Sequence, residues 1–282
     1  MTPRAETEPD REGRPVPRRP APRRAAPRRR SSRWSAPGWR VPPRRLVVTP
    51  VVLAALLSAT YLWMSHVHLD AIARNALAGG NARLRLWQHV ELTAVSTFWV
   101  LLIAVPLGIA LTRRGLRRAA PVATAVANVG QATPAIGLLA LLVIWLGIGP
   151  TTAITGMVAY AVLPVLSNTM AGLRAIDPRM VEAARGIGMS AAGRLLRVEL
   201  PLAVPLILAG VRTALVLNVG TATLATFVGG GGLGDLITTG IQTRRMAVLV
   251  LGSVLTVALA LLVDWLASLA ELLLTPRGLA AR

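Results

Sequence analysis

Six long apolar stretches constrain the fold of this chain more than any other feature of its sequence. A helix needs about 20 mostly apolar residues to cross the roughly 30 Å hydrocarbon core of a bilayer. Six stretches reach that length, at about 46–65, 88–111, 119–147, 151–172, 203–228 and 246–271. In lipid, the backbone polar groups of such segments are satisfied only in helices or closed barrels. We therefore expect an all-α integral membrane protein with six transmembrane helices.

The third apolar stretch is overlong and is interrupted by Asn128, Gln131 and Pro134. Proline lacks a backbone donor, and its ring clashes with the preceding helical turn, so we expect this span to be kinked or broken near Pro134. Such breaks are tolerated at membrane depth only where protein or water satisfies the freed backbone groups.

The chain is apolar and strongly basic at once, and much of its charge lies apart from the apolar stretches. Hydrophobic residues make up 54% of the 282 residues and charged residues 15%, yet the formal net charge is +19. Residues 1–45 hold 14 Arg, four acidic residues and 10 of the 20 prolines. This composition predicts a disordered tail. We interpret the tail as a cytoplasmic segment held near anionic membrane lipid, in preference to a nucleic-acid tether.

The distribution of arginine predicts which way the chain crosses the membrane. Cytoplasmic loops of membrane proteins carry the excess of Lys and Arg. With the N-terminus in the cytoplasm, 25 Arg fall on the inner side and five on the outer side. We therefore expect both termini in the cytoplasm, a first transmembrane helix at 46–65, an outer loop at 66–87 and a cytoplasmic tail at 272–282.

Missing residue types exclude several kinds of chemistry. The chain has no cysteine, which excludes disulfides, thiolate metal sites and cysteine nucleophiles. All 31 basic residues are Arg, so lysine-dependent phosphate loops and Schiff bases are excluded as well. The three histidines, His66, His68 and His89, fall near the outer surface without other metal ligands. We expect no catalytic residue, no metal site and no enzyme activity of this chain by itself.

The segment 177–201 is too polar for a membrane span and too regular for a loose loop. Asp177 is suited to cap a helix with Pro178 at its first position. That helix is expected to end at Gly186 or Gly188, where a left-handed residue costs little. Ser190 is expected to cap a second short helix that stops before Pro201.

This segment resembles the EAA motif of ABC importer permeases. The matching residues are Glu182-Ala183-Ala184, then Gly188 after three residues, Val198 after nine more, and Leu200-Pro201. The only departure is Val198, where the family pattern has Ile. The resemblance implies that 177–201 is a coupling segment that docks on an ATP-binding subunit through Glu182, Ala183, Ala184, Gly188, Leu200 and Pro201. It also implies that the partner subunit uses ATP and that this chain binds no cofactor.

From about Gln88 onward the chain is similar to permeases for osmoprotectants such as glycine betaine, carnitine and choline. The similarity implies a five-helix permease core at 88–271, a second permease copy or a sister permease, and an extracytoplasmic solute-binding protein. It places the chain in a bacterial plasma membrane. The matching stretches are 128–134, 163–169, 209–214 and 227–236.

Polar side chains within the spans are candidates to line a translocation path, because they are costly in lipid and usually face a bundle interior or water. The alternative is hydrogen bonding between helices packed through small residues. We expect Arg212 and Asp264, near inner span ends, to snorkel or to pair rather than to bind cargo. The candidates for the path are Asn128, Gln131, Thr133, Pro134, Asn168, Asn218, Thr221 and Thr223.

Gly229 to Gly234 satisfy the pattern G-x-G-x-x-G, but no strand precedes them and no lysine completes a phosphate loop. We expect either a close-packed or hinge-like outer turn leading into Asp235, or a flexible linker.

Three functions remain open from the sequence. The first is an ATP-driven importer of a quaternary-ammonium osmoprotectant, with selectivity residing largely in the binding protein. The second is an ABC permease for an amino acid such as methionine, which would share the coupling motif. The third is a self-sufficient secondary transporter, although no inverted repeat of broken helices is evident.

Overall fold

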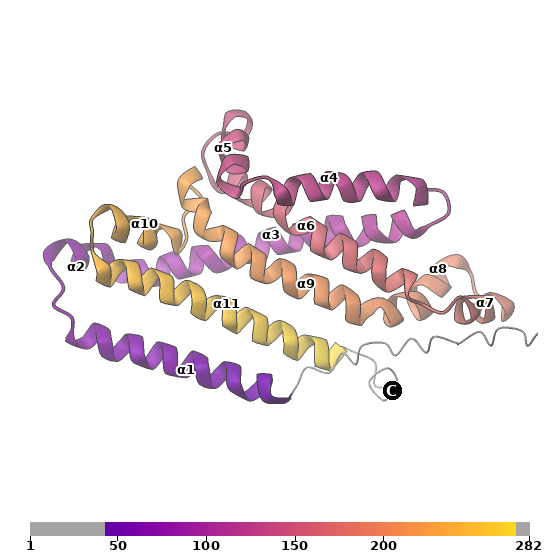
Figure 1. Ribbon diagram of the computed structural model, residues 1–282, viewed down its shortest axis with the longest axis horizontal. Helices are drawn as coiled ribbons and strands as arrows, with labels where there is room; N and C mark the ends of the chain where they lie inside the picture. Colours follow the sequence, from indigo (N-terminus) through magenta and orange to yellow (C-terminus); the bar gives the residue numbers. More distant parts are fainter. Residues whose placement is uncertain (1–42, 275–282) are drawn as a thin grey trace, which may run out of the picture. The chain divides into compact units, whose positions relative to one another are not determined.

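A computed structural model describes residues 43–274 of the chain (Figure 1). The predictions made for the basic tail and for the last residues of the chain lie outside these described residues. Within 43–274 every regular element is a helix. The principal helices are α1 (Pro43–His66), α2 (Ala71–Leu77), α3 (Asn81–Thr112), α4 (Ala120–Ala132), α5 (Ala135–Leu146), α6 (Pro150–Arg174), α7 (Pro178–Gly186), α8 (Ala191–Arg194), α9 (Leu200–Ala222), α10 (Gly234–Gln242) and α11 (Met246–Leu274).

The helical architecture agrees with six membrane spans. Five helical segments are long and apolar enough to cross a membrane, and the total reaches six if α4 and α5, which are bent by 101° at the break between them, count as one broken span. The bend lies at Thr133 and Pro134, as the sequence predicts. The Tyr160 hydroxyl donates a hydrogen bond to the Thr133 carbonyl, so the break is partly satisfied by protein.

Helix α6 lies at the centre of the described bundle, where it packs against α3, α4, α5 and α9 (Figure 1). Close approach depends on small residues. A Cβ on Gly210 would lie 2.8 Å from the Asn168 Cβ, and one on Gly108 would lie 2.8 Å from a Thr169 methyl group. Helix α1 packs beside α11, and the Trp265 indole donates a 3.0 Å hydrogen bond to the Leu46 carbonyl.

Two predicted segments contain regular structure that the sequence did not indicate. The expected outer loop at 66–87 contains α2 and the first turns of α3, because the Asp70 carboxylate caps α2 at the Ala73 N–H, 2.9 Å away. Ala73 then packs with Leu233 and Val248. The fifth apolar stretch belongs to a candidate span that ends at Val228, as predicted, but α9 ends at Ala222 and residues 223–228 form a tighter 3₁₀ turn.

The prediction that the second short helix stops before Pro201 is wrong. Residues 195–199 form one π-helical turn that joins α8 to α9, and the Leu200 N–H bonds the Leu195 carbonyl. Pro201 is in the first turn of α9, where its missing donor is tolerated. Because the wider turn carries the chain through the proline, the coupling segment continues directly into a membrane helix.

Candidate functional site

The segment between α6 and α9 has the capped form that its sequence predicts. The Asp177 carboxylate accepts the Arg179 N–H at 2.9 Å, and the Ser190 hydroxyl oxygen accepts the Gly193 N–H at 3.1 Å. Between these caps, Gly188 has a left-handed φ of +83°. Figure 1 shows α7 and α8 together at one end of the bundle, opposite α2 and α10. We call 177–201 the coupling segment and its end of the bundle the coupling end.

The motif residues of the coupling segment divide between its surface and its interior. Glu182, Ala183 and Gly188 are exposed, whereas Ala184 is buried. Leu200 and Pro201 are half-buried in the first turn of α9. Two large apolar side chains, Met180 and Ile187, are 48% and 80% exposed beside the motif. An exposed apolar surface of this kind, rimmed by charge, is typical of a protein-docking site.

Glu199 connects the coupling segment to the end of α3. One carboxylate oxygen lies 2.7 Å from Arg113 Nη2 and the other lies 3.2 Å from Arg194 Nε. The Glu199 side chain is only 8% exposed. Sequence reasoning missed this residue, because its partner Arg113 lies on a different segment of the chain and no local pattern marks the pair.

The predicted path residues fall into two groups. In the first group, the side chains bond within the bundle: Asn218 is buried and donates to the Thr97 hydroxyl at 2.9 Å. This contact is the helix–helix bonding that the sequence left open as the alternative. The remaining members bond a backbone carbonyl about one turn earlier in the chain: Thr133 to Val129, Asn168 to Pro164, Thr221 to Leu217, and Thr223 to Gly220.

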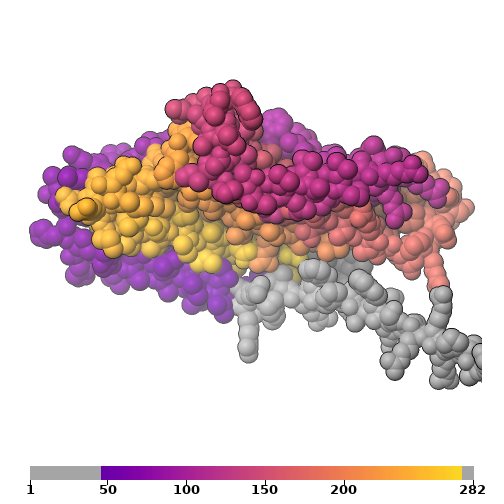
Figure 2. Space-filling view, turned by 45° about the horizontal axis from the view of Figure 1, so that its top comes forward, coloured from indigo at the N-terminus to yellow at the C-terminus, as the bar shows by residue number. Residues whose placement is uncertain are grey.

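The second group lies on one face of α4. It consists of Asn128 and Gln131, which follow Thr124, a residue that the sequence did not single out, at i+4 and i+7, so that all three lie on one side of the helix. Among the described residues, the side-chain amides of Asn128 and Gln131 make no hydrogen bond to another group. We call this face, together with the facing part of α6, the polar groove. Figure 2 shows α4 lying along the surface of the bundle.

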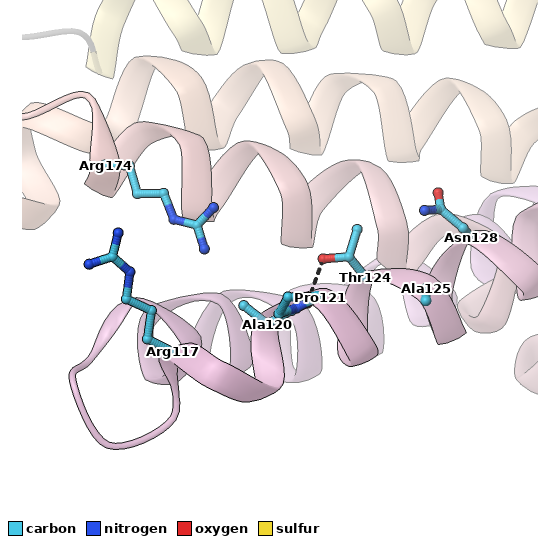
Figure 3. Close-up of a pocket in the computed structure, with 7 residues that line it drawn as sticks. All are labelled: Arg117, Ala120, Pro121, Thr124, Ala125, Asn128 and Arg174. Carbon is cyan, nitrogen blue, oxygen red and sulfur yellow. Dashed lines mark hydrogen bonds between the residues drawn. The ribbon is translucent and has the colours of Figure 1, made fainter.

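A pocket of about 480 Å³ occupies the polar groove at the coupling end (Figure 3). Arg117 lies just before α4 and Arg174 is the last residue of α6. Figure 3 shows both guanidinium groups in the space between the two helices. The lining residues are Arg117, Ala120, Pro121, Thr124, Ala125, Asn128 and Arg174.

The glycine-rich turn at the opposite end is held against α3. The His89 side chain is fully buried against this turn. Its Nδ1 accepts the Leu233 N–H at 3.2 Å, so Nε2 carries the proton and donates to the Val219 carbonyl at 3.0 Å. Arg85 pairs with Asp235 at 2.5 Å. The turn is therefore close-packed and is not a flexible linker.

Arg212 and Asp264 form a two-pronged ion pair between α9 and α11, with N–O distances of 2.5 and 2.7 Å. The expectation that they pair is confirmed. This arrangement ties two membrane helices together and leaves neither side chain free to bind a solute.

Known proteins resemble this chain along most of its sequence. Residues 104–274 match the family described as "Binding-protein-dependent transport system inner membrane component". The choline transport system permease protein OpuBB of Bacillus subtilis is 38% identical over 201 residues, which cover 71% of this chain and 92% of that protein. The osmoprotectant import permease protein OsmY of Salmonella typhimurium is 40% identical over 179 residues, covering 64% and 76%.

Solved structures agree with this sequence similarity. An inward-facing structure of the MetNI methionine ABC transporter matches with a TM-score of 0.61 and 25% identity, covering 69% of this chain and 96% of the matched chain. A bacterial ABC transporter involved in alginate import matches with a TM-score of 0.55 and 14% identity, over 82% and 94%. The second similarity concerns the fold alone.

Proposed function

This chain belongs to the binding-protein-dependent inner membrane components, the permease subunits of ABC importers, and we propose that it imports a quaternary-ammonium osmoprotectant such as glycine betaine, carnitine or choline. The main support is the sequence similarity to choline and osmoprotectant permeases along about two-thirds of the chain. The methionine transporter is a structural relative. Because permeases for different solutes share this fold, the structural similarity says less about the transported solute than the higher sequence identity to the choline and osmoprotectant permeases does.

The coupling segment is the proposed docking site for the ATP-binding subunit. Its surface offers the Glu182 carboxylate, the small Ala183 side chain and the exposed Ile187, which together supply a directional contact and apolar area. Glu199 and the π-helical turn join this surface to α3 and α9. ATP then drives transport because the dimerised ATPase subunits bind one conformation of the permease more tightly than the other.

The polar groove along α4 is the proposed translocation path. Asn128 and Gln131 face it without protein partners among the described residues, and Thr133 and Pro134 form the break at its far end. Asn168 and Thr221 bond backbone carbonyls of their own helices, and the Asn218 amide nitrogen donates to Thr97, so we assign these three side chains to helix packing and not to the path. A second permease copy or a sister permease would close the path.

The remaining partners follow from the family. ABC importers of this kind work with an ATP-binding subunit and a substrate-binding protein. The chain is a multi-pass inner membrane protein. We propose that the coupling end faces the cytoplasm, where ATP is available, and that both termini lie there. We also propose that the chain binds no cofactor of its own.

Uptake into proteoliposomes tests the cargo and the energy source together. The complex of this chain with its ATPase subunit and binding protein is expected to accumulate labelled glycine betaine, carnitine or choline only when ATP is supplied. Methionine is expected neither to accumulate nor to compete. Uptake of methionine alone would refute the proposed cargo. Uptake by the permease without the ATPase subunit would support a secondary transporter instead.

The turn between α7 and α8 supplies a specific prediction. Gly188→Ala is expected to lower ATP-driven uptake about fivefold, because a Cβ in the left-handed region costs about 1–2 kcal/mol and the turn would rearrange. Gly186→Ala is the matched control, since Gly186 is helical and a Cβ there meets open space. Equal uptake by the two variants would contradict a role for the turn conformation.

A further inference from the structure

The two arginines at the coupling end of the polar groove are not paired with acids. Arg117 and Arg174 take part in no ion pair among residues 43–274, and the Arg174 guanidinium has a single polar side-chain contact there, 4.0 Å long, to the Met170 sulfur. Figure 3 shows their guanidinium groups pointing into the same space. Two like charges in one pocket repel each other and raise the local positive potential. An anionic group entering the pocket would relieve that repulsion.

The polar groove is better suited to water than to lipid, by the distribution of side chains around α4. Helix α4 has an apolar stripe of Val122, Val126 and Val129, each about two-thirds exposed, on the side away from the groove. Asn128 lies about 12 Å along α4 from Ala120, and Gln131 about 16 Å, which places both amides at hydrocarbon depth. Unpartnered amides facing hydrocarbon would be costly, so the valine stripe is the face suited to lipid.

The pocket has the wrong lining for a bare quaternary ammonium group. Such cations are held on the faces of aromatic rings. The pocket is lined by two guanidinium groups, a threonine, an asparagine, two alanines and a proline, with no aromatic side chain. Guanidinium groups bind carboxylates through charge-assisted hydrogen bonds and repel cations.

We propose that Arg117 and Arg174 form an anion-attracting mouth at the inner end of the translocation path. The mouth favours cargo that carries a carboxylate beside its ammonium group, as glycine betaine and carnitine do, over choline, which is a simple cation. The carboxylate passes between the guanidinium groups before release to the cytoplasm. This inference rests on the proposed function and adds to it a selective element within the permease.

A charge-selective labelling experiment tests the mouth without any cargo. Because the chain contains no cysteine, Ala125→Cys places a single thiol of this subunit in the pocket. In nanodiscs that hold the whole complex, the thiol is expected to react about tenfold faster with an anionic methanethiosulfonate reagent than with a cationic one. This factor is the lower end of the rate increase that a cleft lined by one sign of charge gives to an oppositely charged ligand. The ratio is expected to fall toward one when Arg117→Gln and Arg174→Gln are added. Ala78→Cys, exposed at the opposite end, is the control thiol. Equal ratios for the Ala125→Cys thiol with and without the two arginines would overturn the proposal.

Uptake measurements test the selectivity. The double variant Arg117→Gln/Arg174→Gln is expected to import glycine betaine about fivefold more slowly, with choline uptake changed less than twofold. The matched control is Arg114→Gln/Arg118→Gln, which removes the same number of charges from the connection that contains Arg117, at residues that do not line the pocket. Equal losses for both cargoes, equal losses in the control, or import of choline alone by the wild type would overturn the carboxylate preference.

Varying the lipid composition tests whether the two arginines act on the carboxylate of the cargo or on anionic lipid headgroups. The effect of the double variant is expected to be the same in phosphatidylcholine liposomes with and without phosphatidylglycerol. An effect confined to liposomes with phosphatidylglycerol would assign the pocket to lipid headgroups and refute the proposal. Failure of the wild-type complex to import any quaternary ammonium compound would refute the proposed function, while the labelling ratio would still report the charge of the mouth.

Discussion

Glu199→Gln is expected to reduce ATP-driven uptake at least tenfold. The carboxylate is nearly buried and receives contacts from Arg113 at 2.7 Å and Arg194 at 3.2 Å. The Arg194 contact is a hydrogen bond to a charged group, which is worth about 1.5–3 kcal/mol, and about 1.4 kcal/mol corresponds to a factor of ten. Loss of the charge would free the coupling segment from the end of α3. Movement of the ATPase subunits would then displace the segment without moving the membrane helices.

The measurements that check this effect must separate coupling from folding. The Glu199→Gln complex is expected to retain its ATPase subunit on purification and to keep hydrolysing ATP, with less transport per ATP. Arg113→Gln should reproduce part of the loss, whereas Arg114→Gln, next to it in the chain and without a contact to Glu199, should be neutral. Uptake within twofold of the wild type in the Glu199 variant would contradict the proposed connection.

Gly240→Ala is expected to prevent correct packing of α10 on α11. A Cβ on Gly240 would lie 2.6 Å from the Leu249 Cα and 2.7 Å from its Cβ, distances that real side chains do not adopt. Relief would require movement of backbone on both helices, since the contact is not with the end of a flexible side chain. Overpacking of this kind costs about 3 kcal/mol of the free energy of unfolding.

Size-exclusion profiles of the purified chain in detergent check the packing prediction. The Gly240→Ala variant should aggregate or yield little monodisperse protein at temperatures where the wild type is stable. Gly220→Ala is the matched control, because a Cβ on this helical glycine meets no atom within 4 Å and alanine favours helix. A normal profile for Gly240→Ala would show that α10 and α11 separate more easily than their contact suggests.

The candidate site divides into parts that local sequence predicts and parts that it does not. The caps at Asp177 and Ser190 and the left-handed Gly188 were predictable, because each depends on a few neighbouring residues. The continuation through Pro201 was predicted wrongly, because a π-helical turn accommodated the proline. His89 offered no local signal, since its partners Leu233 and Val219 lie 144 and 130 residues away.

The path residues show the same division. Asn218 and Asn128 look alike in the sequence as polar residues within apolar stretches. Packing buries Asn218 against Thr97 on α3, whereas Asn128 remains exposed in the polar groove. The difference depends on which way each helix turns toward its neighbours, and helix rotation within a membrane bundle is set by contacts between distant segments.

The sequence by itself determined the number of apolar spans, the break at Pro134 and the coupling motif. These features follow from segment length, proline chemistry and residue spacing, all of which act within about one helix. Only the tertiary structure decided that Glu199 joins α3 to the coupling segment, that His89 holds the glycine-rich turn, and that Arg117 and Arg174 share a pocket. Each of these pairings joins helices remote in sequence, and side chains so far apart along the chain meet only when the bundle packs.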